Sequence, residues 1–182
     1  WNDPDGSRYR DAYFGTFPGV WRHGDWLTVT EDGTYVVHGR SDSTINRGGV
    51  RMGSADIYAA VDAMPEIAAS LVIGAELPGG DYYMPLFVVL AAGAQLSEEL
   101  RKRIRRAIRE QVSPRHVPDD IVAVPAVPTT LTGKKLEVPI KRLIQGVPPE
   151  TAVNRATVAN PEVLSWYADF ATRVRDRFTP SS

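Results

Sequence analysis

Two short glycine-containing turns near the start of the chain constrain its fold most strongly. Asp32-Gly33 lies between the β-rich runs WLTVT and TYVVHG, and Gly48-Gly49 follows the polar stretch RSDSTINR. Asp-Gly between two such runs is a strong short-range hairpin signal, and glycine supplies the positive φ that a tight turn needs. The sequence therefore predicts a β-hairpin at each place.

Helical and strand patterns alternate after the second turn. Apolar spacing predicts helices over about 55–64, 98–112, 139–145 and 161–178, with Ser54 and Ser97 as N-caps of the first two. Apolar runs at 67–77, 84–92 and 120–127 predict strands between them. Hairpins mixed with helices favour an α+β fold over a doubly wound parallel sheet. Residues 1–20 show no periodicity, so we expect irregular structure there.

The composition excludes several classes of protein. Hydrophobic residues make up 43% and charged residues 24% of the 182-residue chain, and the formal net charge is −1, so we expect a globular protein with no nucleic-acid or membrane partner. The absence of cysteine excludes disulfides, thiolate nucleophiles and Cys-based zinc sites. The chain begins at Trp1 and shows no leader or membrane span, so we expect a processed or excised piece of a cytoplasmic protein.

Lys134 follows Gly133 in the polar stretch VPTTLTGKKLEV. Such a lysine is either an ordinary solvated loop residue or a cation delivered to a phosphate. The phosphate-cradling pattern GxxxxGK[ST] is not matched, because Pro128 replaces the first glycine and Lys135 follows the lysine. The loop is therefore not expected to wrap a phosphate, but it can carry an ammonium on a four-carbon stem to an anion bound elsewhere.

Arginines and aspartates in the first 51 residues offer groups that bind phosphate or ribose. Arg40, Arg47 and Arg51 alternate with glycines and Asp42, and an arginine fork can hold phosphate oxygens. The alternative is a solvated hairpin in which Asp and Arg pair. Asp25 begins a predicted strand, and its carboxylate can accept hydrogen bonds from a ribose diol or cap the strand end.

The stretch RKRIRRAIRE carries six basic residues within 101–109. Its apolar positions form one line on the predicted helix, and glutamates dilute its charge. A solvated helix face is therefore favoured over a nucleic-acid site, although one or two of the arginines can meet a polyphosphate.

Three of these stretches resemble motifs of the adenylate-forming acyl-CoA synthetases, the AMP-binding superfamily. WRHGDW is similar to the family's GD motif, GRSDSTINRGGVRM to its hinge motif GRxDxxIKxxGxR, and PTTLTGK to its PxTxSGK motif. The resemblance covers about residues 20–145. The stretches WNDPDGSRYR, RGGVRMGSADIY and SPRHVPD, with the tail after residue 146, favour the acetoacetate-activating branch over the acetate- or propionate-activating ones.

The resemblance implies an architecture of three parts. Residues 1–40 would be the β-rich end of the larger N-terminal AMP-binding domain. Residues 41–146 would be a small C-terminal lid domain, with a β-hairpin and a mainly antiparallel three-stranded sheet packed by helices. Residues 147–182 would be a C-terminal extension with an amphipathic helix.

The resemblance also implies an acid–CoA ligase, which uses ATP and CoA as substrates and Mg²⁺ with the ATP. Asp25, Arg40 and Arg51 would bind ATP, and Asp42 would be the hinge about which the lid domain turns. The hinge motif's usual lysine is Asn46 here, so the sequence offers no ionic role at that position.

Two further groups of residues take roles by resemblance. Lys134 would be the catalytic lysine of adenylation, and Gly49 and Arg109 would bind CoA. Asp56 stands where the family has a longer acid. The missing N-terminal domain would carry the phosphate loop, the Mg²⁺ ligands and the adenine and acyl pockets, so we expect this chain alone to be inactive. The alternative from another class is a non-catalytic binding module with the same fold.

Overall fold

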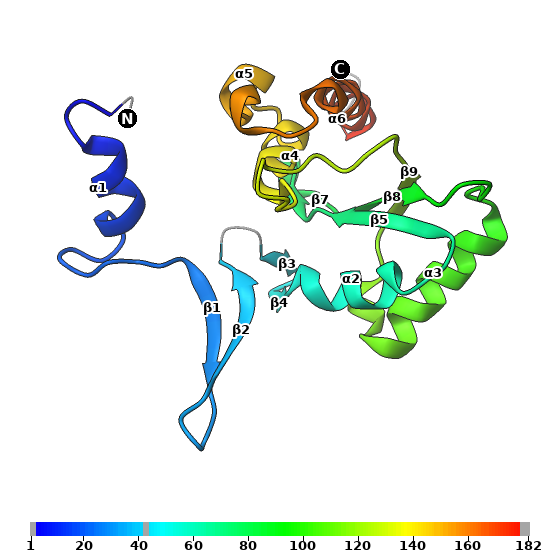
Figure 1. Cartoon of the computed structure of the whole chain (residues 1–182), viewed down its shortest axis with the longest axis horizontal. Helices are drawn as coiled ribbons and strands as arrows, with labels where there is room; N and C mark the ends of the chain where they lie inside the picture. The colour runs from blue at the N-terminus through cyan, green and yellow to red at the C-terminus, as the bar shows by residue number, and fades with distance from the viewer. Residues whose placement is uncertain (1–2, 42–43, 179–182) are drawn as a thin grey trace. The chain divides into compact units, whose positions relative to one another are not determined.

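The computed structural model describes residues 3–41 and 44–178, and the chain folds as two compact units, 1–42 and 43–182. The first unit contains helix α1 (Ser7–Phe14) and the antiparallel strands β1 (Asp25–Val29) and β2 (Tyr35–Arg40) (Figure 1). The hairpin at Asp32-Gly33 is confirmed, and Gly33 has a φ of 80°.

Helix α1 corrects the expectation of irregular structure in residues 1–20. Two aspartates just before the helix bond its free N–H groups: Asp5 accepts from the Ser7 nitrogen at 3.1 Å and Asp3 from the Tyr9 nitrogen at 3.0 Å. Such caps stabilise a helix start that has no apolar periodicity. Tyr9 and Tyr13, one turn apart, also contact each other, with ring centroids separated by 5.2 Å.

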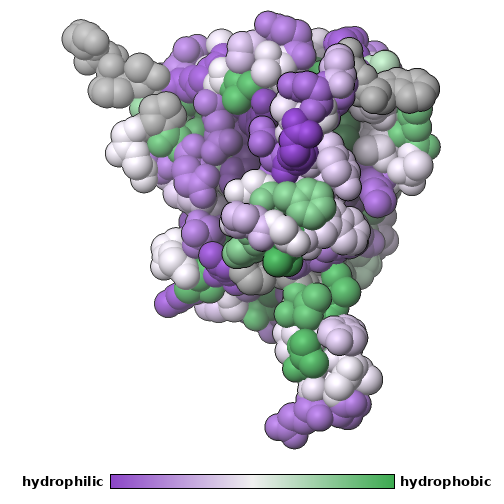
Figure 2. All heavy atoms as spheres, turned by 90° about the vertical axis from the view of Figure 1, so that its left-hand side faces the viewer, coloured by the Kyte–Doolittle hydropathy of each residue, from purple (hydrophilic) through white to green (hydrophobic). Residues whose placement is uncertain are grey.

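The first unit leaves large apolar side chains exposed. All buried hydrophobic residues of the described chain lie at or after Ile45. In Figure 2, hydrophobic residues run along the β1–β2 hairpin and hydrophilic ones lie at its turn. Exposed apolar patches of this kind mark a surface that binds a partner. The residues concerned are Tyr9, Tyr13, Phe17, Val20, Trp21, Leu27, Val29, Tyr35, Val36 and Val37.

The second unit begins with a hairpin and a helix. Strands β3 (Ile45–Arg47) and β4 (Val50–Met52) pair around Gly48 and Gly49, whose φ angles of 57° and 78° confirm the predicted tight turn. Helix α2 (Ser54–Asp62) follows. Its N-cap is Gly53 rather than Ser54, and the Ser54 hydroxyl instead donates to Glu137 at 2.7 Å. The nearby glutamate offers this hydroxyl a tertiary partner that the local sequence does not show.

A three-stranded sheet lies at the centre of the second unit, in the order β5 (Ile67–Val72), β8 (Pro85–Leu90), β9 (Asp120–Ala123). The β5–β8 pair is antiparallel and the β8–β9 pair is parallel. The parallel pair requires a crossover, which α3 (Glu98–Gln111) and the short turn η2 (Pro114–His116) provide. Strands β6 (Ala75–Glu76) and β7 (Tyr82–Tyr83) form a small hairpin around η1 (Pro78–Gly80).

Helices cover both faces of this sheet (Figure 1). Leu86 and Val88 of β8 belong to one hydrophobic cluster with α2 and α3, whereas Phe87 belongs to the other, with α4 (Glu137–Ile144) and α6 (Leu164–Phe178). Alternate strand residues point to opposite faces, so a strand buried on both sides shows an unbroken apolar run. The run PLFVVL is explained in this way.

The segment after residue 146 packs onto the second of these clusters. It contains α5 (Pro149–Ala152), the turns η3 (Arg155–Thr157) and η4 (Pro161–Val163), and α6. The ring of Phe87 meets those of Tyr167 and Phe170 edge-on, at centroid distances of 5.0 and 5.1 Å. Residues 147–178 therefore share a core with the sheet.

Candidate functional site

Lys134 lies at the end of a tight turn. The Thr130 nitrogen donates to the Lys134 carbonyl at 2.8 Å, and the Lys134 nitrogen donates to the Thr130 hydroxyl at 3.0 Å. Gly133 has a φ of 81°, which closes the turn. The Lys134 side chain is exposed and has no ion-pair partner among the residues that the structure describes. The turn therefore presents a free ammonium on a hydrogen-bonded backbone.

Lys135, the next residue, is held in place by contacts on both sides of its ammonium. Its Nζ lies 3.2 Å from Asp62 and 3.5 Å from the centroid of the Tyr58 ring. The Tyr58 hydroxyl donates to Glu137 at 2.6 Å. Burial and the adjacent Glu137 carboxylate raise the pKa of Tyr58 well above its ordinary value, so this hydroxyl stays a donor. Of the two lysines, Lys135 anchors the turn.

The β3–β4 hairpin is fastened to the loop before β9 by Arg47. Its guanidinium donates to the Val117 carbonyl at 2.7 Å and forms an ion pair with Asp119. Asp119 in turn accepts from the Met84 nitrogen at 2.8 Å. Arg47 is thus a paired, structural arginine. A Cβ added at Gly48 or Gly49 would meet nothing within 4 Å, so their turn is open to the outside.

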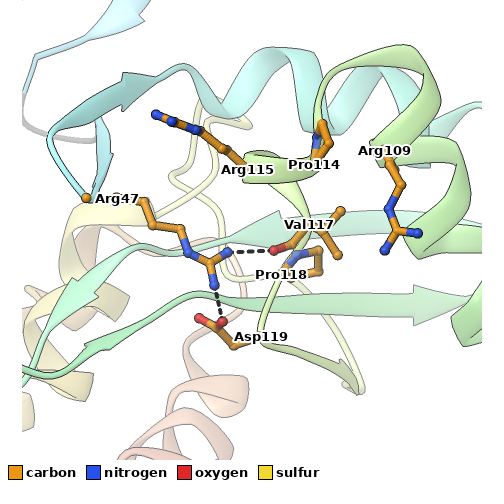
Figure 3. A pocket seen from close by; sticks show the side chains of 8 residues that line it. Arg47, Arg109, Pro114, Arg115, Val117, Pro118 and Asp119 are labelled. Atoms are coloured by element: carbon orange, nitrogen blue, oxygen red, sulfur yellow. Dashed lines mark hydrogen bonds and ion pairs between the residues drawn. The ribbon is translucent and has the colours of Figure 1, made fainter.

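A pocket of about 650 Å³ lies beside this hairpin (Figure 3). Arg109 comes from the last turn of α3 and Arg115 from η2, and neither guanidinium has an ion-pair partner within the described residues. Two arginines without ion-pair partners beside an open turn provide the kind of charge that a polyanion binds. The pocket is lined by Arg47, Gly48, Arg109, Pro114, Arg115, Val117, Pro118 and Asp119.

The other arginines of α3 are mostly occupied. Arg103 pairs with Glu66 at 2.6 Å, and Arg106 pairs with Glu110 at 2.8 Å. Arg101 donates to the Ile121 carbonyl. The Arg103 hydrogen bond lowers the pKa of Glu66. The helix therefore presents a salt-bridged face, with Arg109 available at its C-terminal end.

The first unit brings two of the predicted ATP-binding residues into register. Asp25 of β1 lies opposite Arg40 of β2. The Asp25 carboxylate is 2.5 Å from His23 Nδ1, a partner that the sequence pattern does not predict. The Arg40 side chain and the whole of Asp42, the predicted hinge, lie outside the described residues.

The predicted residues of the second unit fall into separate places. Arg109 and Gly48 line the pocket, whereas the predicted Gly49, next to Gly48 in the turn, and Lys134 are not among the residues that line it. Arg51 lies exposed on β4. The described residues contain no group of three or more His, Asp or Glu side chains able to hold a metal ion, so we assign no metal ligand among them.

Part of the second unit matches a known protein family. The AMP-binding enzyme C-terminal domain matches residues 56–134, from helix α2 to the exposed lysine. Residues 56–134 are therefore similar to the C-terminal domain of an AMP-binding enzyme. The predicted α+β architecture is confirmed, with a sheet that combines one antiparallel and one parallel pair.

Similar proteins extend the likeness beyond residues 56–134. The acetoacetyl-coenzyme A synthetase of Rhizobium meliloti is 46% identical over 168 residues, which are 92% of this chain and 25% of that protein. The solved structure of acetoacetyl-CoA synthetase from Streptomyces lividans has a TM-score of 0.86 and 60% identity, over 95% of this chain and 26% of that one. The anthranilate CoA ligase AuaEII, with anthranoyl-AMP bound, has a TM-score of 0.60 and 26% identity, over 72% of this chain and 25% of that one.

This chain therefore spans about a quarter of the length of the relatives that it matches. The comparisons confirm the superfamily resemblance and the likeness to its acetoacetate-activating branch. No helix among the described residues has both the length and the apolar character needed to span a bilayer.

Several residues around the lysine turn carry no signal in the sequence. Lys135, Tyr58 and Glu137 are far apart in the sequence or carry no motif of their own, and only the fold brings them together. At the pocket, Arg115 carries only a weak sequence signal, because it follows Ser113-Pro114, a sequence that ends a helix.

Proposed function

We propose that this chain is the C-terminal part of a cytoplasmic, ATP-dependent acid–CoA ligase. The whole enzyme would convert acetoacetate, ATP and CoA into acetoacetyl-CoA, AMP and pyrophosphate. Its N-terminal domain would carry the acyl and adenine pockets and the ligands of any Mg²⁺. Relatives that bear the name acetoacetyl-CoA synthetase match both the domain and the extension, which supports this proposal.

One observation carries the mechanism. The second unit has an exposed lysine on a hydrogen-bonded turn and, at a different place, an arginine-lined pocket beside an open glycine turn. A single domain thus holds two sets of groups suited to two different steps. A domain that turns between two orientations can present one set at a time, which keeps the two chemistries apart.

Lys134 would act in the first step. There the acid's carboxylate attacks the α-phosphorus of ATP, and pyrophosphate leaves. Both reactants are anions, so an ammonium near the α-phosphate offsets their repulsion and the charge that develops on the transferring group. Asp25, Arg40 and Arg51 would hold the ribose and phosphates of the nucleotide.

The glycine turn and the pocket would act in the second step, when the CoA thiol attacks the acyl-adenylate and AMP leaves. Gly49 would let the pantetheine arm pass, because glycine adds no side chain at the exposed turn. Arg109 would bind the phosphates of CoA. Asp42 would be the hinge between the two orientations.

The test is Lys134→Ala in the full-length enzyme. We expect acetoacetate-dependent ATP–pyrophosphate exchange to fall by a few hundredfold, since loss of such a charge contact costs roughly 3–4 kcal/mol of barrier. Thioester formation from preformed acyl-adenylate and CoA should stay within about twofold. The matched control is Lys102→Ala, another exposed lysine, on α3.

Equal loss of both half-reactions would contradict the proposed division of roles. A panel of short acids on the same full-length enzyme tests the substrate. A clear preference for acetate or propionate over acetoacetate would reassign the enzyme within its superfamily. Isolated residues 1–182 should catalyse no exchange, and ATP binding by them alone would favour a regulatory module.

A further inference from the structure

The C-terminal extension is hydrogen-bonded to the strand-like segment that leads into the lysine turn. Thr130 and Val158 form an antiparallel bridge. The Ala159 nitrogen donates to the Thr129 carbonyl at 2.9 Å, and the Leu131 nitrogen donates to the Thr157 carbonyl at 3.2 Å. Residues 157–159 thus act as a short strand along the entry to the turn.

One side chain of the extension makes two further bonds to this entry. Asn160 donates from Nδ2 to the Val127 carbonyl at 3.0 Å and accepts at Oδ1 from the Thr129 nitrogen at 3.2 Å. These two backbone groups flank Pro128, which is itself buried and fixes its own φ. A single amide therefore fixes the backbone on both sides of the proline.

The extension is in turn anchored in the core. Tyr167 of α6 is 1% exposed, and its hydroxyl donates to the Ala126 carbonyl at 3.1 Å. Val158 is 4% exposed. Buried side chains of the extension thus support its contacts with residues 126–131, and these contacts belong to the stable core of the second unit.

We propose that residues 157–160 position Lys134 for the adenylation step, with Asn160 as the chief positioning residue. This inference rests on the proposed function. Lys134 itself has four side-chain torsions and no ion-pair partner among the described residues. The backbone of the turn therefore sets the position from which its side chain extends. Misplacement by about 1 Å can cost roughly a hundredfold in rate, so a braced turn has a direct effect on the step. The match to the AMP-binding C-terminal domain stops at residue 134, so the brace comes from outside that match.

The experiment is Asn160→Ala in the full-length enzyme, with both half-reactions measured. We expect acetoacetate-dependent ATP–pyrophosphate exchange to fall by roughly ten- to a hundredfold through a lower kcat. The KM for ATP and thioester formation from preformed acyl-adenylate should stay within about twofold. Asn160→Asp keeps the acceptor for the Thr129 nitrogen and loses the donor, so we expect an intermediate fall in the rate of ATP–pyrophosphate exchange. This variant replaces Asn160→Ala in the test if the alanine variant folds poorly.

The matched control is Asn154→Ala. Asn154 lies in the same extension, but its side chain accepts only from the Ala156 nitrogen, two residues on. A double variant provides the decisive comparison. If Asn160 acts through Lys134, then Asn160→Ala added to Lys134→Ala should slow exchange no further.

Two results would overturn the inference: unchanged exchange in Asn160→Ala, or parallel loss of both half-reactions in a variant whose thermal unfolding is unchanged. Its failure is distinguishable from failure of the proposed function. If Lys134→Ala abolishes exchange while Asn160→Ala does not, only the positioning role is lost. If Lys134→Ala leaves exchange intact, the proposed function itself is wrong.

Discussion

Lys134 and Lys135 are adjacent residues whose ammonium groups have opposite surroundings. Lys135 is partly buried between the Tyr58 ring and Asp62, and such contacts with a ring face and a carboxylate hold a cation in place. Lys134 has no such contacts among the described residues. A catalytic cation must reach a substrate that comes and goes, so the side chain that remains free is the one suited to chemistry.

At the pocket, Arg109 is the residue whose contribution can be measured most directly. We expect Arg109→Ala in the full-length enzyme to raise the KM for CoA by roughly ten- to a hundredfold, because a hydrogen bond to a charged group is worth about 1.5–3 kcal/mol. ATP–pyrophosphate exchange should not change. The control is Arg106→Ala, on the same helix, where the arginine is exposed and pairs with Glu110.

If Arg106→Ala raised the KM for CoA as much as Arg109→Ala does, the helix would attract CoA through its overall charge, without a specific contact at Arg109. Steady-state kinetics at two salt concentrations separate these cases, because diffuse surface attraction weakens as salt increases.

Helix α3 shows how local sequence specifies an element. Ser97 accepts from the Leu100 nitrogen at 3.2 Å, as predicted, and Leu100, Ile104 and Ile108 are all buried on one face. The cap and the periodicity are both encoded within a few residues, so the sequence alone reveals them.

We expect Ser97→Ala to lower the free energy of unfolding by about 0.5–2 kcal/mol, since a helix N-cap contributes that much. Chemical denaturation of the 182-residue chain measures it. Ser165→Ala is the control: this exposed hydroxyl donates to the Glu162 carbonyl and caps no N–H group. A cost below about 0.3 kcal/mol for Ser97→Ala would show that the cap is dispensable.

Other elements depend on partners that local patterns do not show. Ser54 has the residue type of an N-cap, but Glu137, 83 positions away, takes its hydroxyl. Helix α1 has no apolar periodicity and forms with the help of capping aspartates. In both cases a side-chain hydrogen bond that the local pattern does not predict determines the surroundings of the helix start.

At the scale of the whole molecule, the sheet and the extension of the second unit form one core. Phe87, Trp166 and Phe170 form a group of rings, with centroid distances between 5.1 and 6.1 Å. The extension is therefore expected to unfold together with the sheet on which it packs.

We expect Phe170→Ala to lower the free energy of unfolding of the second unit by about 3–5 kcal/mol, the usual cost of an emptied aromatic site. Because the core is shared, amide hydrogen exchange should also speed up in β8, on the opposite side of the contact. Leu131→Ala, which removes an exposed side chain, is the control. Faster exchange confined to α6 would contradict a shared core.

The sequence by itself determined the hairpin turns, the α3 cap and periodicity, the α+β class and the likeness to AMP-binding enzymes. These depend on short spacings, glycine's access to positive φ and motifs that are each contiguous. The tertiary structure alone decided which cations are free. Arg47 is engaged by Asp119, Lys135 by Tyr58 and Asp62, and the lysine turn by a segment some thirty residues later. Charge pairing and hydrogen bonding act over a few ångströms in space, so they depend on neighbours that only the folded chain brings together.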